Sequence, residues 1–399
     1  MNATNRIRVV LTVPHLNRTA SPYREMMAIA KHLSRKDFDL SICALRDGGH
    51  RETGPLLDRL GVPWFVAAFR PRNRSAREIW RSIQAQREIK RHGPFDIQHS
   101  LDFTSSPAEA LGARAGGRRY VYNQRNMNEN GHPSVLRIKF RLSNRIVSIA
   151  DHVRRFLVEQ GAAASKIVNI RNGIDLEETD RELAVANAEP QNCILVLGQI
   201  EPRKRHQDII RALPFVLTDY PDMRVAIAGN VYHKQYFEEL KRLARELGVE
   251  SKIDFLGARD DVPRLLRQSR ALVLCSESEG LPWVILEAMA ARLPFVGSDI
   301  GAHREVVKHG QTGLLAPLDD PAGYAAAIKR VLSDREFAGR LTAQARTAVE
   351  REFSAVTMVR QLELTYLEMM HSETNPHPVN AVPLARTAER AREARLEAE

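Results

Sequence analysis

Short apolar runs alternate with amphipathic stretches along almost the whole chain of 399 residues. The run IRVVLTV at 7–13 is followed by an amphipathic segment at 24–33, and the same succession begins again with CILVL at 193–197. Such runs predict buried strands, and strands joined through helices predict a parallel sheet with helices on both faces. The chain is therefore expected to be an α/β protein. This expectation excludes collagen-like, coiled-coil and wholly disordered classes, and the content of 43% hydrophobic and 27% charged residues agrees.

The expected elements form two sets, separated by a polar stretch at 176–192 that is the best candidate for a linker. The first set has strands at 7–13, 40–45, 62–67, 96–99, 119–122 and 145–149, with helices at 24–33, 75–91, 107–114 and 151–160. The second set has strands at 193–197, 224–228, 252–256, 271–275 and 294–298, with helices at 207–216, 234–247, 262–267 and 282–291. This order predicts two facing, Rossmann-like, doubly wound domains that bind ligands at the carboxyl ends of their strands.

The predicted domain bounds are 1–178 and 190–355. Residues 342–370 have one continuous helical pattern, and its part 356–370 is expected to cross back to the first domain. The tail 371–399 begins rich in proline and ends in a run of Ala, Arg and Glu, so it is expected to be mobile.

Cysteine usage and hydropathy indicate the compartment. Cys43, Cys193 and Cys275 are far apart and form no C-x-x-C pair, so neither a disulfide framework nor a zinc module is expected. No apolar run approaches the roughly 18–20 residues of a spanning helix. The first residues enter a strand-like run without the apolar region of a signal peptide. We therefore expect a cytoplasmic protein.

The net charge of +10 is unevenly distributed. Residues 1–150 contain 26 Lys and Arg against 12 Asp and Glu, or +14, whereas the rest of the chain contains 33 against 37, or −4. A basic first half and a near-neutral second half indicate different partners. For the basic half, composition leaves nucleic acid, anionic lipid and a phosphorylated substrate open.

The segment 276–291 (SESEGLPWVILEAMAA) carries the strongest chemical signal. Pro282 occupies the expected first position of a helix that is apolar except for Glu287. Burying a lone carboxylate is costly, so Glu287 is expected to have partners, and two vicinal sugar hydroxyls are suitable donors. Glu279 lies in the preceding loop, near the positive end of that helix. The structural alternative is that Glu287 bonds to nearby backbone and Glu279 caps the helix.

The run 273–317, with ESEGLPWVILEAMAARLPFVGSDIGAHREVVKHGQTGLLAP, resembles the signature of the family 4 glycosyltransferases, retaining enzymes of the GT-B fold. Glu279 and Glu287 match the E-x7-E pair of that family. IRNGID at 170–175, LGQIEPRK at 197–204 and IDFLG at 253–257 agree in order and spacing. The resemblance covers nearly all of residues 5–370 and is most specific in the second half. It implies that a sugar moves from a nucleotide-diphosphate sugar to an acceptor hydroxyl with retention.

The resemblance also implies roles in the second half. Lys204 matches the lysine that contacts the diphosphate, where a fixed ammonium stabilises the departing charge; a solvated charge is the structural alternative. The arginine that the family has five residues earlier is Gln199 here, which leaves Arg203 or Arg205 as substitutes. The expected catalytic residues are Lys204, Glu279 and His99. The expected donor-binding residues are Gly198, Gln199, Arg203, Arg259, Gly280, Leu281, Pro282, Glu287, Gly301 and Ala302.

The first half departs further from the family. Ser21–Pro22 replaces a Gly-Gly type pair after the first strand. His99 matches the first position of the H-x-H motif, Leu101 replaces the second, and Asp102 is a substitute for the missing group. A core histidine is the alternative for His99. The expected acceptor-binding residues are Asp102, Arg125 and Asn126, and His15 and Arg24 are further candidates for the cleft.

Neither a metal nor a cofactor is expected besides the nucleotide sugar. The pairs Asp260–Asp261 and Asp319–Asp320 suit helix caps better than a D-x-D metal motif, and the family generally needs no metal. Two alternatives stay open. One is a non-catalytic GT-B scaffold with a degenerate site, and the other is a nucleotide-sugar epimerase, which would lack the E-x7-E pair. No G-x-G-x-x-G follows an expected strand, which speaks against a dinucleotide oxidoreductase.

Basic side chains stand beside apolar ones in the segments 75–91 and 136–145. This pattern suits adsorption to an anionic membrane, and the resemblance favours a saccharide or lipid-linked acceptor in bacterial cell-envelope, lipopolysaccharide or other polysaccharide synthesis. The alternative is that the apolar residues belong to the core and the charges are solvated. No recognised binding motif supports nucleic acid as a partner. A peripheral position on the inner face of the cell membrane is thus expected beside the cytoplasmic one.

Overall fold

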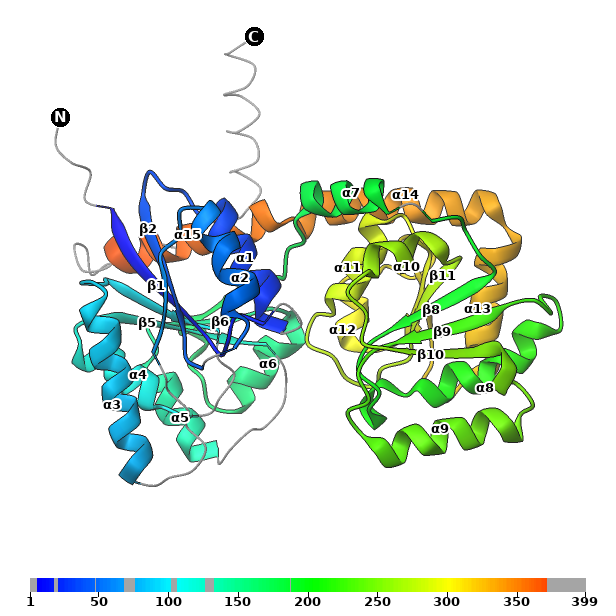
Figure 1. Cartoon of the computed structure of the whole chain (residues 1–399), viewed down its shortest axis with the longest axis horizontal. Helices are drawn as coiled ribbons and strands as arrows, with labels where there is room; N and C mark the ends of the chain where they lie inside the picture. Colours follow the sequence, from blue (N-terminus) through cyan, green and yellow to red (C-terminus); the bar gives the residue numbers. More distant parts are fainter. Residues whose placement is uncertain are drawn as a thin grey trace, which may run out of the picture.

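The computed structural model describes residues 6–17, 21–46, 48–67, 76–101, 106–125, 133–186 and 188–371. Two parallel sheets lie side by side, each between layers of helices (Figure 1). The expected α/β class with two Rossmann-like domains is therefore confirmed. None of the helices in the described ranges combines the length and apolarity that a membrane span requires.

The first sheet, as far as it is described, has seven parallel strands in the order β3-β2-β1-β4-β5-β6-β7. Their bounds are β1 (Ile7–Val13), β2 (Phe38–Ala44), β3 (Trp64–Val66), β4 (Ile97–Ser100), β5 (Arg119–Gln124), β6 (Arg145–Ser148) and β7 (Ile167–Asn169). β1 is an interior strand, with Val9 opposite Leu40 on one side and Ile97 on the other. A central parallel strand is covered on both faces, which explains the nearly continuous apolar run that predicted it.

Helices cover both faces of this sheet (Figure 1). They are α1 (Ser21–His32), α2 (His50–Arg59), α3 (Ala76–Arg91), α4 (Ala108–Ala115), α5 (Pro133–Leu142) and α6 (Asp151–Glu159), with a 3-10 turn η1 (Ala164–Lys166). The sequence pattern did not predict α2, because Gly54 and Pro55 interrupt its periodicity. It also missed the three-residue strand β7, which is too short to show a period.

The second sheet has six described strands in the order β10-β9-β8-β11-β12-β13. Their bounds are β8 (Cys193–Leu197), β9 (Arg224–Ala228), β10 (Ile253–Gly257), β11 (Ala271–Leu274), β12 (Phe295–Ser298) and β13 (Leu314–Ala316). The surrounding helices are α8 (His206–Leu217), α9 (Lys234–Glu246), α10 (Val262–Gln268), α11 (Trp283–Ala290), α12 (Gly301–Arg304), α13 (Pro321–Ser333) and α14 (Arg335–Glu352), with η2 (Pro202–Lys204) and η3 (Glu250–Lys252). All elements predicted for this half are present, within a few residues.

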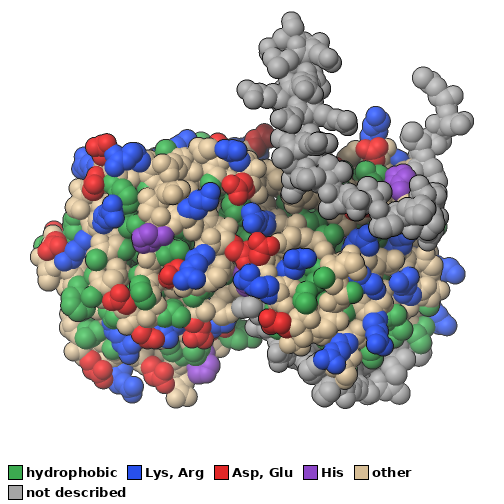
Figure 2. All heavy atoms as spheres, turned by 180° about the vertical axis from the view of Figure 1, so that it is seen from behind, with side chains coloured by type: hydrophobic (Ala, Val, Ile, Leu, Met, Phe, Trp, Pro, Cys, Tyr) green, Lys and Arg blue, Asp and Glu red, His purple; other side chains and the backbone are tan. Residues whose placement is uncertain are grey.

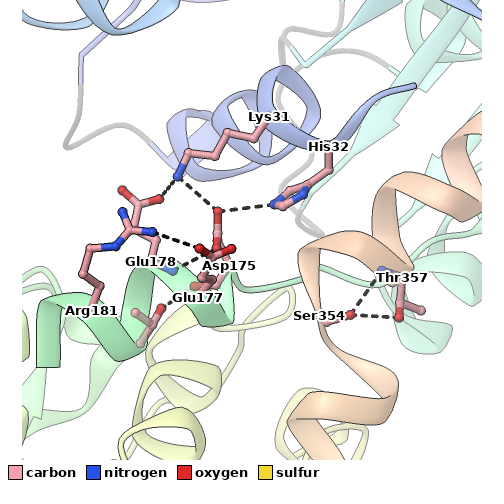
Figure 3. A network of polar contacts seen from close by, with 9 residues as sticks. Lys31, His32, Asp175, Glu177, Glu178, Arg181, Ser354 and Thr357 are labelled. Carbon is pink, nitrogen blue, oxygen red and sulfur yellow. Dashed lines mark hydrogen bonds and ion pairs between the residues drawn. The ribbon is translucent and has the colours of Figure 1, made fainter. Parts of the chain in front are cut away.

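The polar stretch 176–192, predicted as a linker, begins with the helix α7 (Leu176–Val185). Asp175 caps this helix by accepting from the amide of Glu178 at 3.1 Å, and Leu183 is buried in the core. Figure 3 shows that the same carboxylate also binds Lys31 at 3.1 Å and His32 at 3.3 Å, both on α1. These hydrogen bonds, with that from His32 the strongest, hold the pKa of Asp175 far below its ordinary value. The connection between the sheets is therefore tied to the first domain.

The single helix predicted for 342–370 is wrong, because the chain forms α14 and then α15 (Ala355–His371), with a break at Phe353–Ser354. The Ser354 side chain accepts from the amide of Thr357 at 3.1 Å and so caps the new helix (Figure 3). At the break the chain passes against Gly173, where a Cβ atom would lie 2.3 Å from the carbonyl oxygen of Ser354. Periodicity does not detect this change of direction, because both helices continue the same apolar pattern.

α15 lies on the first sheet, although its residues follow the second domain in sequence (Figure 1). The apolar side chains of one core cluster come from α15, α1, β1 and β2, and include Met358, Leu362 and Tyr366. The second domain has its own apolar cluster between β8, β9 and α8. The tail predicted to be mobile lies, apart from His371, outside the described residues.

Candidate active site

The loops that follow β8 and β11 bring two expected catalytic residues together. Lys204 ends the short turn η2 after β8, and Glu279 lies in the loop between β11 and α11. The Nζ atom of Lys204 is 2.5 Å from Oε1 of Glu279. Adjacent parallel strands end at the same edge of a sheet, so residues far apart in sequence meet there.

Glu279 is a buried and ionised carboxylate. Only 8% of the surface of Glu279 is exposed. Burial acts to raise its pKa, but Lys204, the Ser276 side chain and Arg203 outweigh that effect, so the pKa of Glu279 lies below its ordinary value. The loop around Lys204 therefore carries a fixed positive charge beside a fixed negative one.

Arg203 is turned into this site, whereas Arg205 is turned away from it. The Arg203 guanidinium donates to the carbonyl oxygen of Ser278 at 2.6 Å and lies 3.5 Å from Oε2 of Glu279. Arg205 instead pairs with Asp208 and Asp319. Of the two arginines that the sequence left open as substitutes for the cation missing at Gln199, Arg203 is the one beside Lys204 and Glu279. The side chain of Gln199 is exposed.

Gly198 allows the chain to pass close to its neighbours after β8. Its φ is 156°, and a Cβ atom there would lie 3.5 Å from Cε of Lys204. A Cβ on Gly229, after β9, would lie 1.8 Å from the carbonyl oxygen of Gly198. Gly229 thus permits a close approach of the two loops, and Gly198 supplies the positive φ at which the chain leaves β8.

Glu287 lies on α11 and is paired with a residue of the other domain. Arg24 of α1 forms an ion pair with Oε1 of Glu287, and its guanidinium carbon is 5.9 Å from the centre of the Trp283 ring. Burial raises the pKa of Glu287, and Arg24 offsets this only in part. Within the described residues, its second oxygen has no hydrogen-bond partner. Pro282, predicted as the first helical residue, is the N-cap of α11 instead.

Three consecutive residues of the loop before α11 contact the first domain. The carbonyl oxygen of Glu279 is 3.0 Å from Nε2 of His152, and that of Leu281 accepts from Nδ2 of Asn172 at 2.9 Å. Between them, a Cβ atom on Gly280 would lie 2.2 Å from the carbonyl oxygen of Arg125. The loop between β11 and α11, called the donor loop below after the role expected for Gly280, Leu281 and Pro282, therefore rests on the first domain.

Gly301 and Ala302 open the four-residue helix α12, directly after β12. The next residue, His303, is fully buried, and its Nδ1 lies 2.8 Å from the carbonyl oxygen of Ser298. Burial lowers the pKa of His303 to about 4, so this ring is neutral near pH 7. Arg259, by contrast, forms an ion pair of 2.6 Å with Asp261 at an exposed position. The structure shows no contact of Arg259 with Lys204, Glu279 or Glu287.

His99 lies in the core of the first domain rather than among the loops. The residue is fully buried on β4, and its Nδ1 is 2.6 Å from the hydroxyl oxygen of Tyr366 on α15. Burial lowers the pKa of His99 to about 4. The catalytic role expected for His99 is thus contradicted by its position, because its side chain faces the C-terminal helix; the core alternative describes it better.

Arg125 follows β5 and is buried with a carboxylate. Its guanidinium forms an ion pair with Glu25 of α1, which also accepts from the side chain of Asn123. Burial lowers the pKa of Arg125 to about 10. Arg125 therefore reaches the second domain through its backbone, at Gly280. Two other expected acceptor contacts, Asp102 and Asn126, lie outside the described residues.

His15, another candidate for the cleft, accepts from the amide of Asn17 at 3.3 Å through Nδ1. The pair Ser21–Pro22 forms the first turn of α1. Arg24 is the one candidate of this region that the structure brings to an expected donor residue, Glu287.

A cavity of about 360 Å³ lies at the opposite edge of the second sheet, lined by α10, by the residues after α11, and by α13 and α14. Four arginines are among its lining residues: Arg267, Arg270, Arg292 and Arg335. Arg267 is in the last turn of α10 and Arg292 follows α11, where cations complement the negative ends of helices. None of the expected site residues lines this cavity.

The described residues contain no cluster of three or more His, Cys, Asp or Glu arranged to hold a metal ion. Asp320 caps α13 by accepting from the amide of Gly323 at 2.8 Å. Asp261 occupies the N-cap position of α10 but makes its ion pair with Arg259, so it is no side-chain cap.

Two family models match consecutive parts of the chain. Residues 25–178 match the model described as Glycosyltransferase Family 4, and residues 178–348 match Glycosyl transferases group 1. The chain belongs to the family 4 glycosyltransferases. The Lys204–Glu279 pair and Glu287 lie within the second match.

Curated relatives agree with this membership. Phosphatidyl-myo-inositol mannosyltransferase of Mycolicibacterium smegmatis is 28% identical over 329 residues, which cover 77% of this chain and 83% of that protein. N-acetyl-alpha-D-glucosaminyl L-malate synthase of Bacillus anthracis is 29% identical over 201 residues, which cover 50% of this chain and 51% of that protein. Glycogen synthase of Mycobacterium tuberculosis is 33% identical over 55% of this chain and 52% of its own length. The chain spans about half the length of the last two relatives.

Solved structures show that this glycosyltransferase family member has the GT-B fold. The crystal structure of HepE of Anabaena in complex with UDP and glucose has a TM-score of 0.74 at 20% identity, covering 91% of this chain and 100% of that one. A glycosyltransferase of Rickettsia africae has a TM-score of 0.76 at 19% identity, covering 92% and 99%.

The sequence missed three residues of the interdomain contact: His152, Asn172 and Glu305. Glu305 stands within the quoted signature, but its partner is in the other domain. Asn172 stands in the motif IRNGID, but its partner too is in the other domain, whereas His152 belongs to a segment without a chemical signal of its own. Only the meeting of the two domains reveals them.

Proposed function

We propose that this protein is a retaining glycosyltransferase that moves a sugar from a nucleotide-diphosphate sugar to a hydroxyl group. The observation that carries the proposal is the Lys204–Glu279 ion pair of 2.5 Å at the carboxyl edge of the second sheet, with Glu287 on the following helix. Membership of family 4 and the GT-B fold support it.

The roles follow from charge and position. Breaking the bond between the anomeric carbon and the diphosphate oxygen leaves a developing negative charge, which the Lys204 ammonium stabilises, with Arg203 as the second cation. Amide groups at Gly301 and Ala302 add donors on the same side. Glu287 accepts from the two ribose hydroxyls after Arg24 gives up its ion pair.

Retention follows from a front-side reaction. The acceptor oxygen forms its bond on the face from which the diphosphate leaves, and the acceptor proton passes to a leaving phosphate oxygen. Glu279 holds Lys204 and the sugar in place. This proposal needs no metal ion, and the cations of the protein itself carry the charge.

The decisive experiment is transfer or slow hydrolysis with a panel of UDP- and GDP-sugars, read as released nucleotide diphosphate. We expect activity with one donor class, unaffected by a metal chelator, and an α-linked product from an α-linked donor. A well-folded protein that binds and cleaves no nucleotide sugar would instead support the scaffold alternative. NMR of the new anomeric proton tests retention.

For the acceptor, we propose a saccharide or lipid-linked molecule of the bacterial envelope, with the protein on the inner face of the membrane. One relative acts on phosphatidyl-myo-inositol, as its name states. Figure 2 shows Lys and Arg side chains spread over the face of the first domain. On the described parts of α3 to α6, the exposed basic residues are Arg87, Lys90, Arg91, Arg114, Arg137, Arg141, Arg154 and Arg155.

Four exposed apolar residues stand on the same helices: Ile83 on α3, Leu111 on α4, Ile138 on α5 and Val158 on α6. Leu136 and Phe140 are buried in the core instead, and Lys139 is buried with its Nζ 3.6 Å from the centre of the Tyr122 ring. The membrane face proposed from α5 is therefore narrower than the sequence suggested. The test is flotation with liposomes that contain anionic lipid, at low and high salt. Failure to float at low salt would favour a soluble acceptor.

A further inference from the structure

His152 of the first domain reaches between two donor-site loops of the second domain. It lies in the first turn of α6 and is 9% exposed. Its Nδ1 is 2.7 Å from Oε1 of Glu305, and its Nε2 is 3.0 Å from the main-chain oxygen of Glu279. A Cβ atom on Gly301 would lie 3.9 Å from the Cβ of His152. The ring therefore contacts the loop that carries Glu279 and packs beside the start of α12.

Glu305 is a carboxylate that caps a helix of the other domain. Its Oε2 accepts from the amide of Asp151 at 2.6 Å and its Oε1 from the amide of His152 at 2.8 Å. Burial acts to raise the pKa of Glu305, but the hydrogen bonds of the His152 side chain and of these amides outweigh it, so its pKa lies below its ordinary value. Glu305 therefore offers only acceptor atoms.

The partners of His152 determine its protonation state in this arrangement. A carboxylate oxygen and a carbonyl oxygen both accept, so both ring nitrogens must donate for both contacts to exist. Only the imidazolium form has two N–H groups. A neutral ring keeps one of the two hydrogen bonds and turns a lone pair toward the other acceptor.

We propose that His152 is a positioning residue for sugar transfer: its imidazolium joins Glu305 to the main chain of Glu279 and so holds the donor loop on the first domain. This inference rests on the proposed function of the site, since it acts through Glu279 and the paired Lys204. His152 does not touch either side chain. His152 acts on the alignment of the donor loop. The next two residues of this loop contact the first domain independently, Gly280 at the carbonyl oxygen of Arg125 and Leu281 through the hydrogen bond from Asn172.

The charges around the ring favour the imidazolium. Glu305 pairs with no Lys or Arg of the described residues. Glu279 is balanced by Lys204, and on the histidine's own helix Asp151 lies 3.7 Å from Arg171. The protonated ring therefore makes both hydrogen bonds, and loss of its proton removes one of them.

The experiment compares His152→Gln and Glu305→Gln with His92→Gln, in the full chain. His92 is a matched control, because it also faces a glutamate, Glu88 at 3.3 Å, but on an exposed surface of the first domain. We measure kcat and KM for the donor between pH 5.5 and 8.5, as well as the imidazole nitrogen signals by NMR.

We expect kcat/KM of the unchanged protein to contain a step that falls with rising pH. His152→Gln lacks this step and has about ten-fold lower kcat/KM at low pH, as the loss of one charged hydrogen bond predicts. Glu305→Gln moves the step to lower pH, and His92→Gln leaves it in place. The His152 signal, assigned by its absence in His152→Gln, shows two protonated nitrogens at pH 5.5.

A neutral His152 ring at pH 5.5, or a His152→Gln profile parallel to that of the unchanged protein, would overturn the proposal. The NMR measurement needs no turnover. If no nucleotide sugar reacts at all, the proposed function fails while the protonation of His152 is still decided. Equal unfolding temperatures of His152→Gln and His92→Gln separate positioning from a general loss of stability.

Discussion

Lys204 and Glu279 form an ion pair of 2.5 Å, although 75 positions separate them in the sequence. The pair joins the loop after β8 to the loop after β11. The Arg203 guanidinium lies 3.5 Å from the other carboxylate oxygen of Glu279. The carboxylate thereby keeps two cations side by side, and under the proposed function these are the cations that face the leaving diphosphate.

Replacing Lys204 with alanine is expected to lower kcat by about 100- to 1,000-fold, because the lost ammonium acts on charge that develops in the transition state. Steady-state kinetics at saturating donor measures this effect, with thermal unfolding as the control for folding. Arg203→Ala should cost less. If Lys204→Ala stays within a few-fold of the unchanged protein while Arg203→Ala does not, Arg203 is the essential cation.

Glu279→Gln and Glu287→Gln are expected to change stability in opposite directions at neutral pH. The pKa of Glu279 is lowered by its cations despite burial, so its contribution to stability is full above the ordinary glutamate value, about 4.3, and disappears as the pH falls through the lowered value. Glu279→Gln should therefore unfold at a lower temperature at pH 7.

For Glu287 burial raises the pKa, so the folded state holds the proton more tightly, and the stability from the protonated form disappears as the pH rises through that raised value. Glu287→Gln should keep or increase the unfolding temperature at pH 7 while donor affinity falls. Calorimetric titration with the donor measures the affinity. Unchanged affinity in this variant would contradict the ribose contact.

Gly280→Ala should disturb the interdomain contact, because the new Cβ would lie 2.2 Å from the carbonyl oxygen of Arg125. We expect a loss of about 1–3 kcal/mol in the free energy of unfolding and a higher KM for the donor. The matched control is Gly339→Ala on α14, where a Cβ meets no atom within 4 Å and alanine favours the helix. A Gly280→Ala protein as stable and active as the control would show that the domains separate in solution.

Tyr366→Phe tests the position of His99. The change removes the hydrogen bond of 2.6 Å to Nδ1 of a fully buried ring and should cost about 1–3 kcal/mol of stability. Since this hydrogen bond lies in the buried core of the first domain and the structure shows no contact of either ring with Lys204, Glu279 or Glu287, kcat should stay within about two-fold. A large fall in kcat without loss of stability would return His99 to the catalytic residues.

The order of strands and helices could be predicted from the sequence because buried parallel strands and amphipathic helices have different apolar periods. The positions of Lys204, Glu279 and Glu287 after strands of the second sheet were predictable as well, since they stand in short segments with a fixed spacing, whereas their roles stay predictions. α2, β7 and the break at Ser354 were not, because they are short or continue the pattern of their neighbours.

The sequence by itself determined that this chain is a two-domain α/β protein. It also determined that Glu279 and Glu287 stand before and within an apolar helix that follows one strand of the second domain. Only the tertiary structure decided which groups meet across the domains: Arg24 with Glu287, and His152 with the Glu305 side chain and the main chain of Glu279. The physical reason is that apolar periodicity is a local property of the backbone, whereas these contacts depend on how two separately folded sheets are oriented. The same limit applies to His99, whose burial was decided by a helix that returns from the far end of the chain.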